Sequence, residues 1–193
     1  MSDNILHIIT PIYRFEHLEK IYNSILMNDD ILWHISKSTK RKEPIPEVIK
    51  NDKRVKIYDI DCDDTDTTKK RNTILETIKN GYFCFLDDDT IFHENMYVKY
   101  LECKESNFEG MFIGEQLDKY GKLRLIASPP KFTRIDTGNV LTHSSCLKTC
   151  KWPETYEYGK NAKDSLFWES VYTFYNYKCA IWNQPISYYN KLR

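Results

Sequence analysis

The chain has 193 residues, with 28 Lys and Arg against 28 Asp and Glu, so its formal net charge is zero. This balance argues against a protein that coats nucleic acid or an anionic membrane, because those partners select a basic surface. Its content of 41% hydrophobic and 14% aromatic residues suits a packed core and excludes disordered and low-complexity classes. We therefore expect a single globular domain over residues 1–193.

The chain contains no apolar segment long enough to cross a membrane, and its first residues lack the basic leader of a secretory signal. We expect no membrane span and a cytoplasmic location. None of the six cysteines forms a C-x-x-C pair. They are expected to be reduced thiols, mostly buried in the core.

Hydrophobic periodicity predicts strands and helices in alternation over the first half of the chain. In order these are a strand at 5–10, a helix at 16–27, strands at 31–35 and 55–60, a helix at 68–79 that Gly81 closes, a strand at 82–86 and a helix at 94–103. The second half has short strands at 110–115 and 122–127, an apolar run ending at 142, a helix at 164–175 and a strand at 179–182. The pattern predicts an α/β fold with a mostly parallel central sheet, helices on both faces and mixed strands in the second half.

Three consecutive carboxylates, Asp87, Asp88 and Asp89, follow the most apolar of the predicted strands, and we refer to them as the acidic run. Ligands of parallel sheets bind outside the carboxyl ends of the strands. Adjacent carboxylates repel one another unless a cation or hydrogen-bond donors offset the charge. Mg²⁺ and Mn²⁺ prefer such oxygen ligands. The alternative is that Asp89 or Thr90 merely caps the helix at 94–103.

Three further segments carry candidate site residues. The end of the first strand, residues 10–14, offers backbone amides, an aromatic ring and a guanidinium. Arg71 lies near a helix start, where cations and backbone amides attract phosphate, although it fits a solvated charged face as well. Asp164 begins a predicted helix and is either an N-cap or a general base.

Taken together, these segments resemble the GT-A-fold glycosyltransferases of the large inverting family that includes many bacterial and viral sugar transferases. The resemblance rests on IITPIYR at 8–14, NDKRVKIY at 51–58, KRN at 70–72, GYFCFLDDDT at 81–90, GNVL at 138–141 and KDSLFW at 163–168. The strand that ends in the acidic run, as a DXD motif, is its most specific part. The compact length is similar to that of minimal capsid-glycosylating domains of large DNA viruses, which would work in the host cytoplasm.

The resemblance implies a Rossmann-like GT-A domain, with a nucleotide-sugar-binding half at 1–103 and an acceptor-binding half at 104–193. It implies metal-dependent, inverting transfer of a sugar from a nucleotide-sugar, with UDP favoured, to a hydroxyl of a glycan or glycoprotein. The implied donor contacts are Thr10, Pro11, Tyr13, Arg14, Arg71, Asp87 and Asp88. Asp89 would bind Mn²⁺ or Mg²⁺, and Asp164 would be the catalytic base.

The sequence departs from the family pattern in two places. The second strand ends in His34-Ile35-Ser36-Lys37 where the family has an acidic pair, so Asp59 or Asp61 is the substitute candidate for base recognition. Lys163 stands where the family has Glu beside the catalytic acid. His143 is a candidate second metal ligand or a structural residue.

Two other functions remain in competition with this one. Because fold does not determine function, the chain could instead be a nucleotide-sugar-binding protein on the same fold. Such a protein would bind the nucleotide-sugar without turning it over. A phosphatase of the haloacid dehalogenase type needs Asp-x-Asp-x-Thr, and counting from Asp87 places Ile91 where Thr is required. A calcium-binding EF-hand loop starting at Asp59 fails, since Asp64 and Lys70 stand at its Gly and Glu positions.

Overall fold

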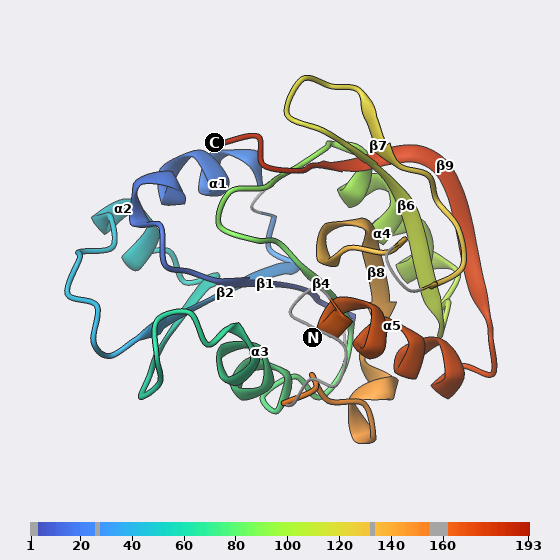
Figure 1. Cartoon of the computed structure of the whole chain (residues 1–193), viewed down its shortest axis with the longest axis horizontal. Helices are drawn as coiled ribbons and strands as arrows, with labels where there is room; N and C mark the ends of the chain where they lie inside the picture. Colours follow the sequence, from blue (N-terminus) through green and yellow to red (C-terminus); the bar gives the residue numbers. More distant parts are fainter. Residues whose placement is uncertain (1–3, 26–27, 132–133, 155–161) are drawn as a thin grey trace.

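The computed structural model describes residues 4–25, 28–131, 134–154 and 162–193. Within this part of the chain, nine strands form one sheet in the order β3-β2-β1-β4-β8-β6-β9-β5, with β7 paired to β6 (Figure 1). The strands are β1 (Leu6–Pro11), β2 (Ile31–Ser38), β3 (Val55–Ile60), β4 (Tyr82–Phe85), β5 (Ile91–Phe92), β6 (Met111–Leu117), β7 (Leu123–Leu125), β8 (Val140–His143) and β9 (Cys179–Tyr188). The helices are α1 (Leu18–Ser24), α2 (Glu47–Lys50), α3 (Thr67–Leu75), α4 (Asn95–Glu105) and α5 (Ala162–Phe174). Short 3-10 turns are η1 (Phe15–His17), η2 (Thr137–Asn139) and η3 (Ser144–Lys148).

The first half of the sheet is parallel. β1 lies between β2 and β4 and pairs with both in parallel, and β3 extends this part beyond β2. The carboxyl ends of β1 and β4 therefore meet at one edge, because parallel neighbours end on the same side. This arrangement brings the loop after β1 next to the acidic run, which follows β4.

The second half of the sheet is mixed. β8 joins antiparallel to β4 and to β6, whereas β9 runs parallel to β6 and then pairs antiparallel with β5. The ladder between β6 and β9 shifts register twice near Glu115, where Pro185 lies opposite. Proline cannot donate a ladder hydrogen bond, which explains an irregularity at this point.

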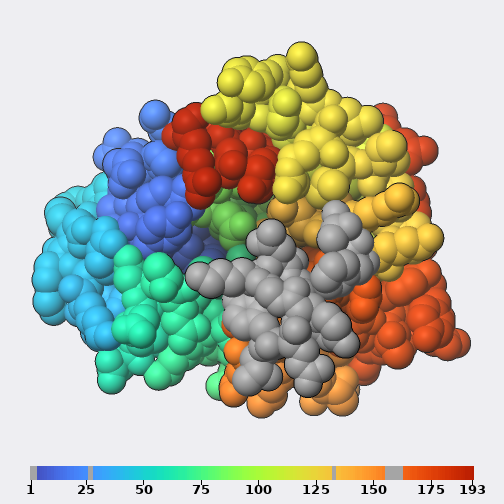
Figure 2. Space-filling view, viewed as in Figure 1, coloured from blue at the N-terminus to red at the C-terminus, as the bar shows by residue number. Residues whose placement is uncertain are grey.

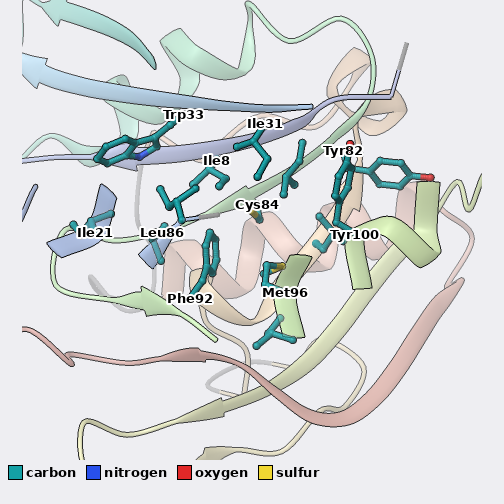
Figure 3. Close-up of a cluster of buried hydrophobic side chains, with 14 of the residues drawn as sticks. Ile8, Ile21, Ile31, Trp33, Tyr82, Cys84, Leu86, Phe92, Met96 and Tyr100 are labelled. Carbon is teal, nitrogen blue, oxygen red and sulfur yellow. The ribbon is translucent and has the colours of Figure 1, made fainter. Parts of the chain in front are cut away.

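Helices cover both faces of the sheet, and each face has its own core. α1 and α4 pack on the face that carries Ile8 and Cys84 (Figure 3). α3 and α5 pack on the opposite face, against Phe83 and Phe85. Successive residues of β4 thus alternate between two apolar layers, as expected for a strand buried on both sides.

The predicted α/β class, with a mostly parallel sheet and mixed strands in the second half, is confirmed, but several element boundaries differ. The first helix is shorter than 16–27, because a 3-10 turn precedes α1 and α1 ends at Ser24; the predicted end at 26–27 lies outside the described residues. β2 continues to Ser38, and β9 continues six residues past the predicted end at 182. β5 was not predicted, since two residues are too few to show a period.

Gly81 does not close α3 as predicted, because α3 ends at Leu75. The residue has a positive φ of +87°, and a Cβ there would lie 2.3 Å from the carbonyl oxygen of Ile5. Tyr82 N–H donates to that same carbonyl at 2.8 Å. Gly81 is therefore required by the close approach of two backbone segments at the entrance to β4.

Five of the six cysteines are buried and all six are free, which confirms the prediction of core thiols. Within the described residues, no helix combines the length and apolar character needed to cross a membrane.

Candidate active site

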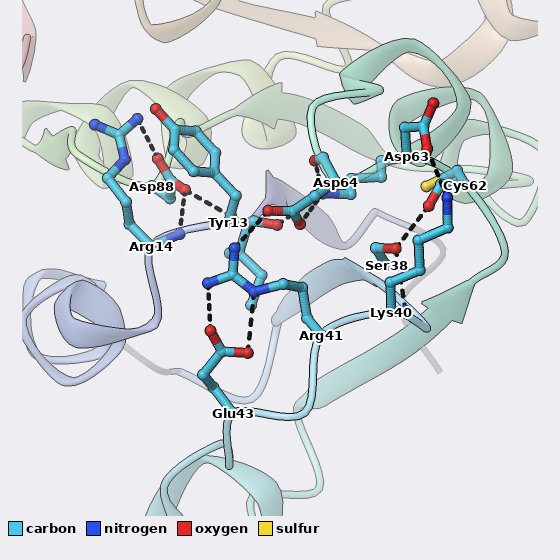
Figure 4. A network of polar contacts seen from close by, with 12 residues as sticks. Tyr13, Arg14, Ser38, Lys40, Arg41, Glu43, Cys62, Asp63, Asp64 and Asp88 are labelled. Atoms are coloured by element: carbon cyan, nitrogen blue, oxygen red, sulfur yellow. Dashed lines mark hydrogen bonds and ion pairs between the residues drawn. The ribbon is translucent and has the colours of Figure 1, made fainter.

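The loop that follows β1 is fastened to the acidic run through Asp88 (Figure 4). Asp88 Oδ2 accepts hydrogen bonds from the backbone N–H groups of Tyr13 at 2.8 Å and Arg14 at 2.9 Å. Arg14 Nη2 lies 2.6 Å from Asp88 Oδ1. Burial raises the pKa of Asp88, and these donors oppose the rise by stabilising its charged form. Both carboxylate oxygens of Asp88 therefore hold the loop after β1 in place.

Asp89 is buried, with 3% of its surface exposed, yet its carboxylate is shared by two cations. Arg14 Nη1 and Arg193 Nε each lie 2.6 Å from Asp89 Oδ2. The backbone N–H of Leu192 donates to the Asp89 carbonyl at 3.1 Å. The end of the described chain is therefore bound directly to the acidic run.

Asp87 points to a different set of partners. Its Oδ1 is 2.7 Å from Arg71 Nη2, and its Oδ2 accepts a hydrogen bond from Thr137 Oγ1 at 3.1 Å. Asp136 caps η2 by accepting from Gly138 N–H, which places Thr137 toward β4. Unlike Asp88, the Asp87 side chain keeps 34% of its surface exposed. It is the member of the acidic run that is open to a ligand.

Arg71 is enclosed by aromatic rings. Only 5% of the residue is exposed, and its guanidinium carbon lies 4.2 Å from the ring centre of Trp152 and 5.4 Å from that of Phe85. Stacking on aromatic faces suits the planar, weakly hydrated guanidinium. The interpretation of Arg71 as part of a solvated face is therefore wrong, and its position is determined by packing.

Asp164 lies on α5, within reach of the same guanidinium. Its Oδ1 is 3.9 Å from Arg71 Nη1, and a third of its side chain is exposed. Burial raises the pKa of Asp164 to about 7; Arg71 lowers it, and the nearby Asp87 and Asp136 add to the rise. A carboxylate whose pKa is near neutrality is suited to act as a general base.

These groups line one cavity of about 240 Å³ at the carboxyl ends of β1 and β4. Its wall consists of Pro11, Tyr13, Arg14, Thr67, Arg71, Asp87, Asp88, Asp89, Asp164, Tyr189, Asn190 and Arg193. In Figure 2 the dark red C-terminal residues lie between the blue N-terminal surface and the yellow region around β7, next to a recessed green patch. The structure thus brings eight of the predicted site residues together.

Two predicted donor contacts lie outside this cavity. Thr10 is fully buried, and its Oγ1 accepts a hydrogen bond from Trp33 Nε1 at 2.9 Å, so it has a structural role. Asp59 lies on the edge strand β3, where it pairs with Lys37 and keeps 58% of its side chain exposed. Two strands, β2 and β1, lie between β3 and β4 in the sheet order.

The structure does not support His143 as a second metal ligand. His143 is paired in register with Tyr82, the first residue of β4, whereas the acidic run follows the last residue of that strand. Its Nδ1 contacts Ser145 Oγ at 3.0 Å, and its ring packs edge-on against Tyr82. His143 is a structural residue at the opposite end of β4.

Both capping alternatives are wrong. α4 begins at Asn95, with β5 lying between it and the acidic run, and neither Asp89 nor Thr90 caps it. Asp164 lies within the first turn of α5, which already includes Ala162, so it is not an N-cap. Neither Asp89 nor Asp164 therefore serves as a helix cap.

Sequence reasoning missed four residues of the cavity wall: Thr67, Tyr189, Asn190 and Arg193. Three of them follow β9, more than 90 residues after the acidic run. The polar segment 189–193 after the apolar strand is the one sequence feature that could have drawn attention to them. Its contact with Asp89 depends on the parallel pairing of β6 and β9, which local patterns do not encode.

Among the described residues, no group of three His, Cys, Asp or Glu side chains is arranged to hold a metal ion. The carboxylate of Asp89 is nevertheless a hard oxygen donor of the kind that divalent cations prefer, and it lies on the cavity wall. Mg²⁺ sites commonly use one or two carboxylates, with phosphate oxygens and water as the remaining ligands.

Comparison with known proteins supports the fold assignment. No protein-family model and no curated protein matches the sequence. Solved structures that match include TarS 1–349 of S. aureus, with a TM-score of 0.73 and 14% identity, covering 95% of this chain and 60% of that one. TarS 1–349 in complex with UDP matches with a TM-score of 0.75 and the same identity. The TarS structure of greater length matches over 36% of its chain, again with a TM-score of 0.73.

TarS is a GT-A-like glycosyltransferase, so the predicted GT-A fold is confirmed by these neighbours. The present chain spans about 60% of the TarS 1–349 segment.

Proposed function

We propose that the protein is a metal-dependent, inverting glycosyltransferase that moves a sugar from a nucleotide-sugar to an acceptor hydroxyl. The observation that carries this proposal is the placement of Asp164 and the acidic run on the wall of one cavity. A base for the acceptor and a charged site for the donor are thus adjacent. Solved TarS structures in complex with UDP-GlcNAc and UDP support a UDP-sugar as the donor.

In the proposed reaction, Asp164 takes the proton of the acceptor hydroxyl as its oxygen attacks the anomeric carbon. The bond between that carbon and the diphosphate breaks on the opposite face, so the configuration inverts. Asp87, the exposed member of the acidic run, would contact the donor, and Tyr13 and Pro11 would border its nucleoside. Asp88 would act by holding the β1 loop, since both its oxygens are engaged.

Asp89 would hold Mn²⁺ or Mg²⁺, which neutralises charge on the departing nucleoside diphosphate when bound. In this proposal residues 1–103 supply most of the donor site. Residues 104–193 supply Asp164 and the acceptor side, for a hydroxyl on a glycan or glycoprotein.

The first experiment is a thermal-shift panel with UDP, GDP, dTDP and CMP, each with and without Mn²⁺. A ligand that binds the native state raises the melting temperature. We expect a shift with UDP that requires Mn²⁺ and is lost in Asp89→Ala, as checked by calorimetric titration. Asp59→Ala is the control, because it removes an exposed carboxylate outside the cavity.

Absence of a shift with every nucleotide would contradict the proposal. A metal-dependent shift without release of UDP from any UDP-sugar would instead indicate a non-catalytic binding protein on this fold.

A further inference from the structure

The two guanidinium groups on Asp89 come from opposite ends of the chain. Arg14 lies in the loop after β1, and Arg193 follows β9. Both reach the same oxygen, Oδ2, at 2.6 Å. The negative charge on Asp89 Oδ2 is therefore neutralised by two guanidinium groups in this structure.

Arg14 is held in place on several sides. Its Nη2 pairs with Asp88, its own backbone N–H donates to Asp88, and its guanidinium lies 4.3 Å from the centre of the Tyr13 ring. Burial lowers the pKa of Arg14, but the charges of Asp88 and Asp89 outweigh this and raise it above its usual value. Arg14 is thus a permanent cation at the floor of the cavity.

The segment 189–193 is held by contacts that do not involve the Arg193 side chain. The N–H of Tyr189 donates to Leu117 O at 2.8 Å, and the Tyr189 ring lies 3.6 Å below the Arg124 guanidinium. The adjacent Leu192 bonds to the Asp89 carbonyl. The Arg193 side chain itself keeps 49% of its surface exposed. It can therefore turn to another partner without the segment 189–193 being displaced.

The balance of charges in the cavity wall determines how a nucleoside diphosphate could bind there. Four carboxylates, Asp87, Asp88, Asp89 and Asp164, face three guanidiniums, those of Arg14, Arg71 and Arg193. A nucleoside diphosphate would meet net negative charge here. A divalent cation reverses the balance, but it would repel the two guanidiniums that share Asp89 Oδ2. Guanidiniums bind phosphate oxygens as well as carboxylates, through two parallel donors.

We propose that Arg193 exchanges partners during donor binding, while Arg14 stays paired with Asp88. Before the donor binds, Arg14 and Arg193 both neutralise Asp89; when a divalent cation binds Asp89, the half-exposed Arg193 side chain turns to the diphosphate of the donor. This inference rests on the proposed function and assigns Arg193 as a diphosphate ligand. The exchange makes metal and nucleotide binding mutually dependent, because each relieves the charge that opposes the other.

The test is the affinity for Mn²⁺, measured by electron paramagnetic resonance of the free ion, with and without saturating UDP. Arg193→Gln removes one of the two cations that compete with the metal for Asp89, so Mn²⁺ alone should bind about two- to fivefold more tightly, as expected for one partly exposed ion pair. With UDP present the same variant should bind Mn²⁺ more weakly than the wild type, because the diphosphate has lost a ligand. Arg193→Lys, which keeps the charge, should restore most of both effects.

Lys191→Gln is the matched control, since Lys191 lies in the same segment but bonds to Lys119 O at 3.0 Å, away from the acidic run. It should behave as the wild type. An effect of Arg193→Gln that has the same sign with and without UDP, or no effect, would overturn the exchange and leave the glycosyltransferase proposal intact. Failure of the wild type to bind UDP with Mn²⁺ would overturn both.

Discussion

Arg71 joins two carboxylates of the cavity wall: its Nη2 lies 2.7 Å from Asp87 and its Nη1 3.9 Å from Asp164. One buried cation thus connects the end of β4 with the beginning of α5. Because Trp152 and Phe85 hold the guanidinium, its distance from each carboxylate is determined by packing. Arg71 therefore acts on the proposed base through charge, as a positioning residue.

The pH dependence of turnover should reflect this charge. Asp164 works as a base only when ionised, so kcat/KM should rise with pH through about 7. Replacing Arg71 with Gln removes a positive charge that lowers the pKa of Asp164, and the midpoint should move upward by about one pH unit. Arg71→Lys keeps the charge and should move it less. A profile that stays in place in Arg71→Gln would show that the base lies elsewhere.

Asp164→Asn should strongly lower the rate of transfer while sparing the donor site. Loss of a general base lowers the rate by about 10²- to 10⁴-fold. The folded-state pKa of Asp164 lies above its value in an unfolded chain, so its stabilising effect is full at low pH and is lost as pH rises through about 7. At pH 8 the neutral Asn should therefore not lower the melting temperature. Calorimetry with UDP and Mn²⁺ should give wild-type affinity; normal turnover of the variant would refute the assignment.

Two glycines with positive φ form a matched pair for measuring backbone crowding. Gly81→Ala combines left-handed strain with a Cβ 2.3 Å from Ile5 O, so it should cost at least about 2 kcal/mol of unfolding free energy. Gly121 has a φ of +82°, but a Cβ added there would meet no atom within 4 Å, so Gly121→Ala should cost only about 1 kcal/mol. Urea unfolding measures both. Equal losses would mean that the contact with Ile5 is relieved by movement of the backbone.

A buried pair of histidines should make the protein sensitive to mild acid. His7 Nε2 donates to the carbonyl oxygen of Asn80 at 3.1 Å, so a neutral His7 ring accepts at Nδ1 from His34 Nε2, which lies 2.9 Å away. Burial lowers the pKa of His7 to about 4 and that of His34 to about 3. In the unfolded chain both bind protons near pH 6.5. Stability is therefore full above that pH and is lost as pH falls below it, by up to about 2.7 kcal/mol per pH unit for the pair.

Urea unfolding at pH 7 and pH 5 measures this loss. A double variant, His7→Asn with His34→Asn, should be less stable at pH 7 but show a flatter dependence on pH. An unchanged slope between the two pH values would refute the role of the pair.

The candidate site could be predicted in part because its carboxylates belong to local patterns. The acidic run directly follows an apolar strand, and Asp164 opens an amphipathic helix, so each stands out within a dozen residues. The partners of these carboxylates could not be predicted in the same way. Arg193 pairs with Asp89 but is remote from it in the sequence. Arg71 looks like a solvated cation in the sequence, because the Trp152 ring that covers it is also remote.

The sequence by itself determined the alternation of strands and helices, the parallel first half of the sheet and the residues at the carboxyl ends of β1 and β4. It did so because the periods of strands and helices and the positions of Gly and Pro are properties of neighbouring residues. Only the tertiary structure decided that β9 runs beside β6 through Pro185 and carries Arg193 to Asp89. It likewise removed Thr10, Asp59 and His143 from the site. Those outcomes depend on strand order and long-range packing, which no short segment of the chain encodes.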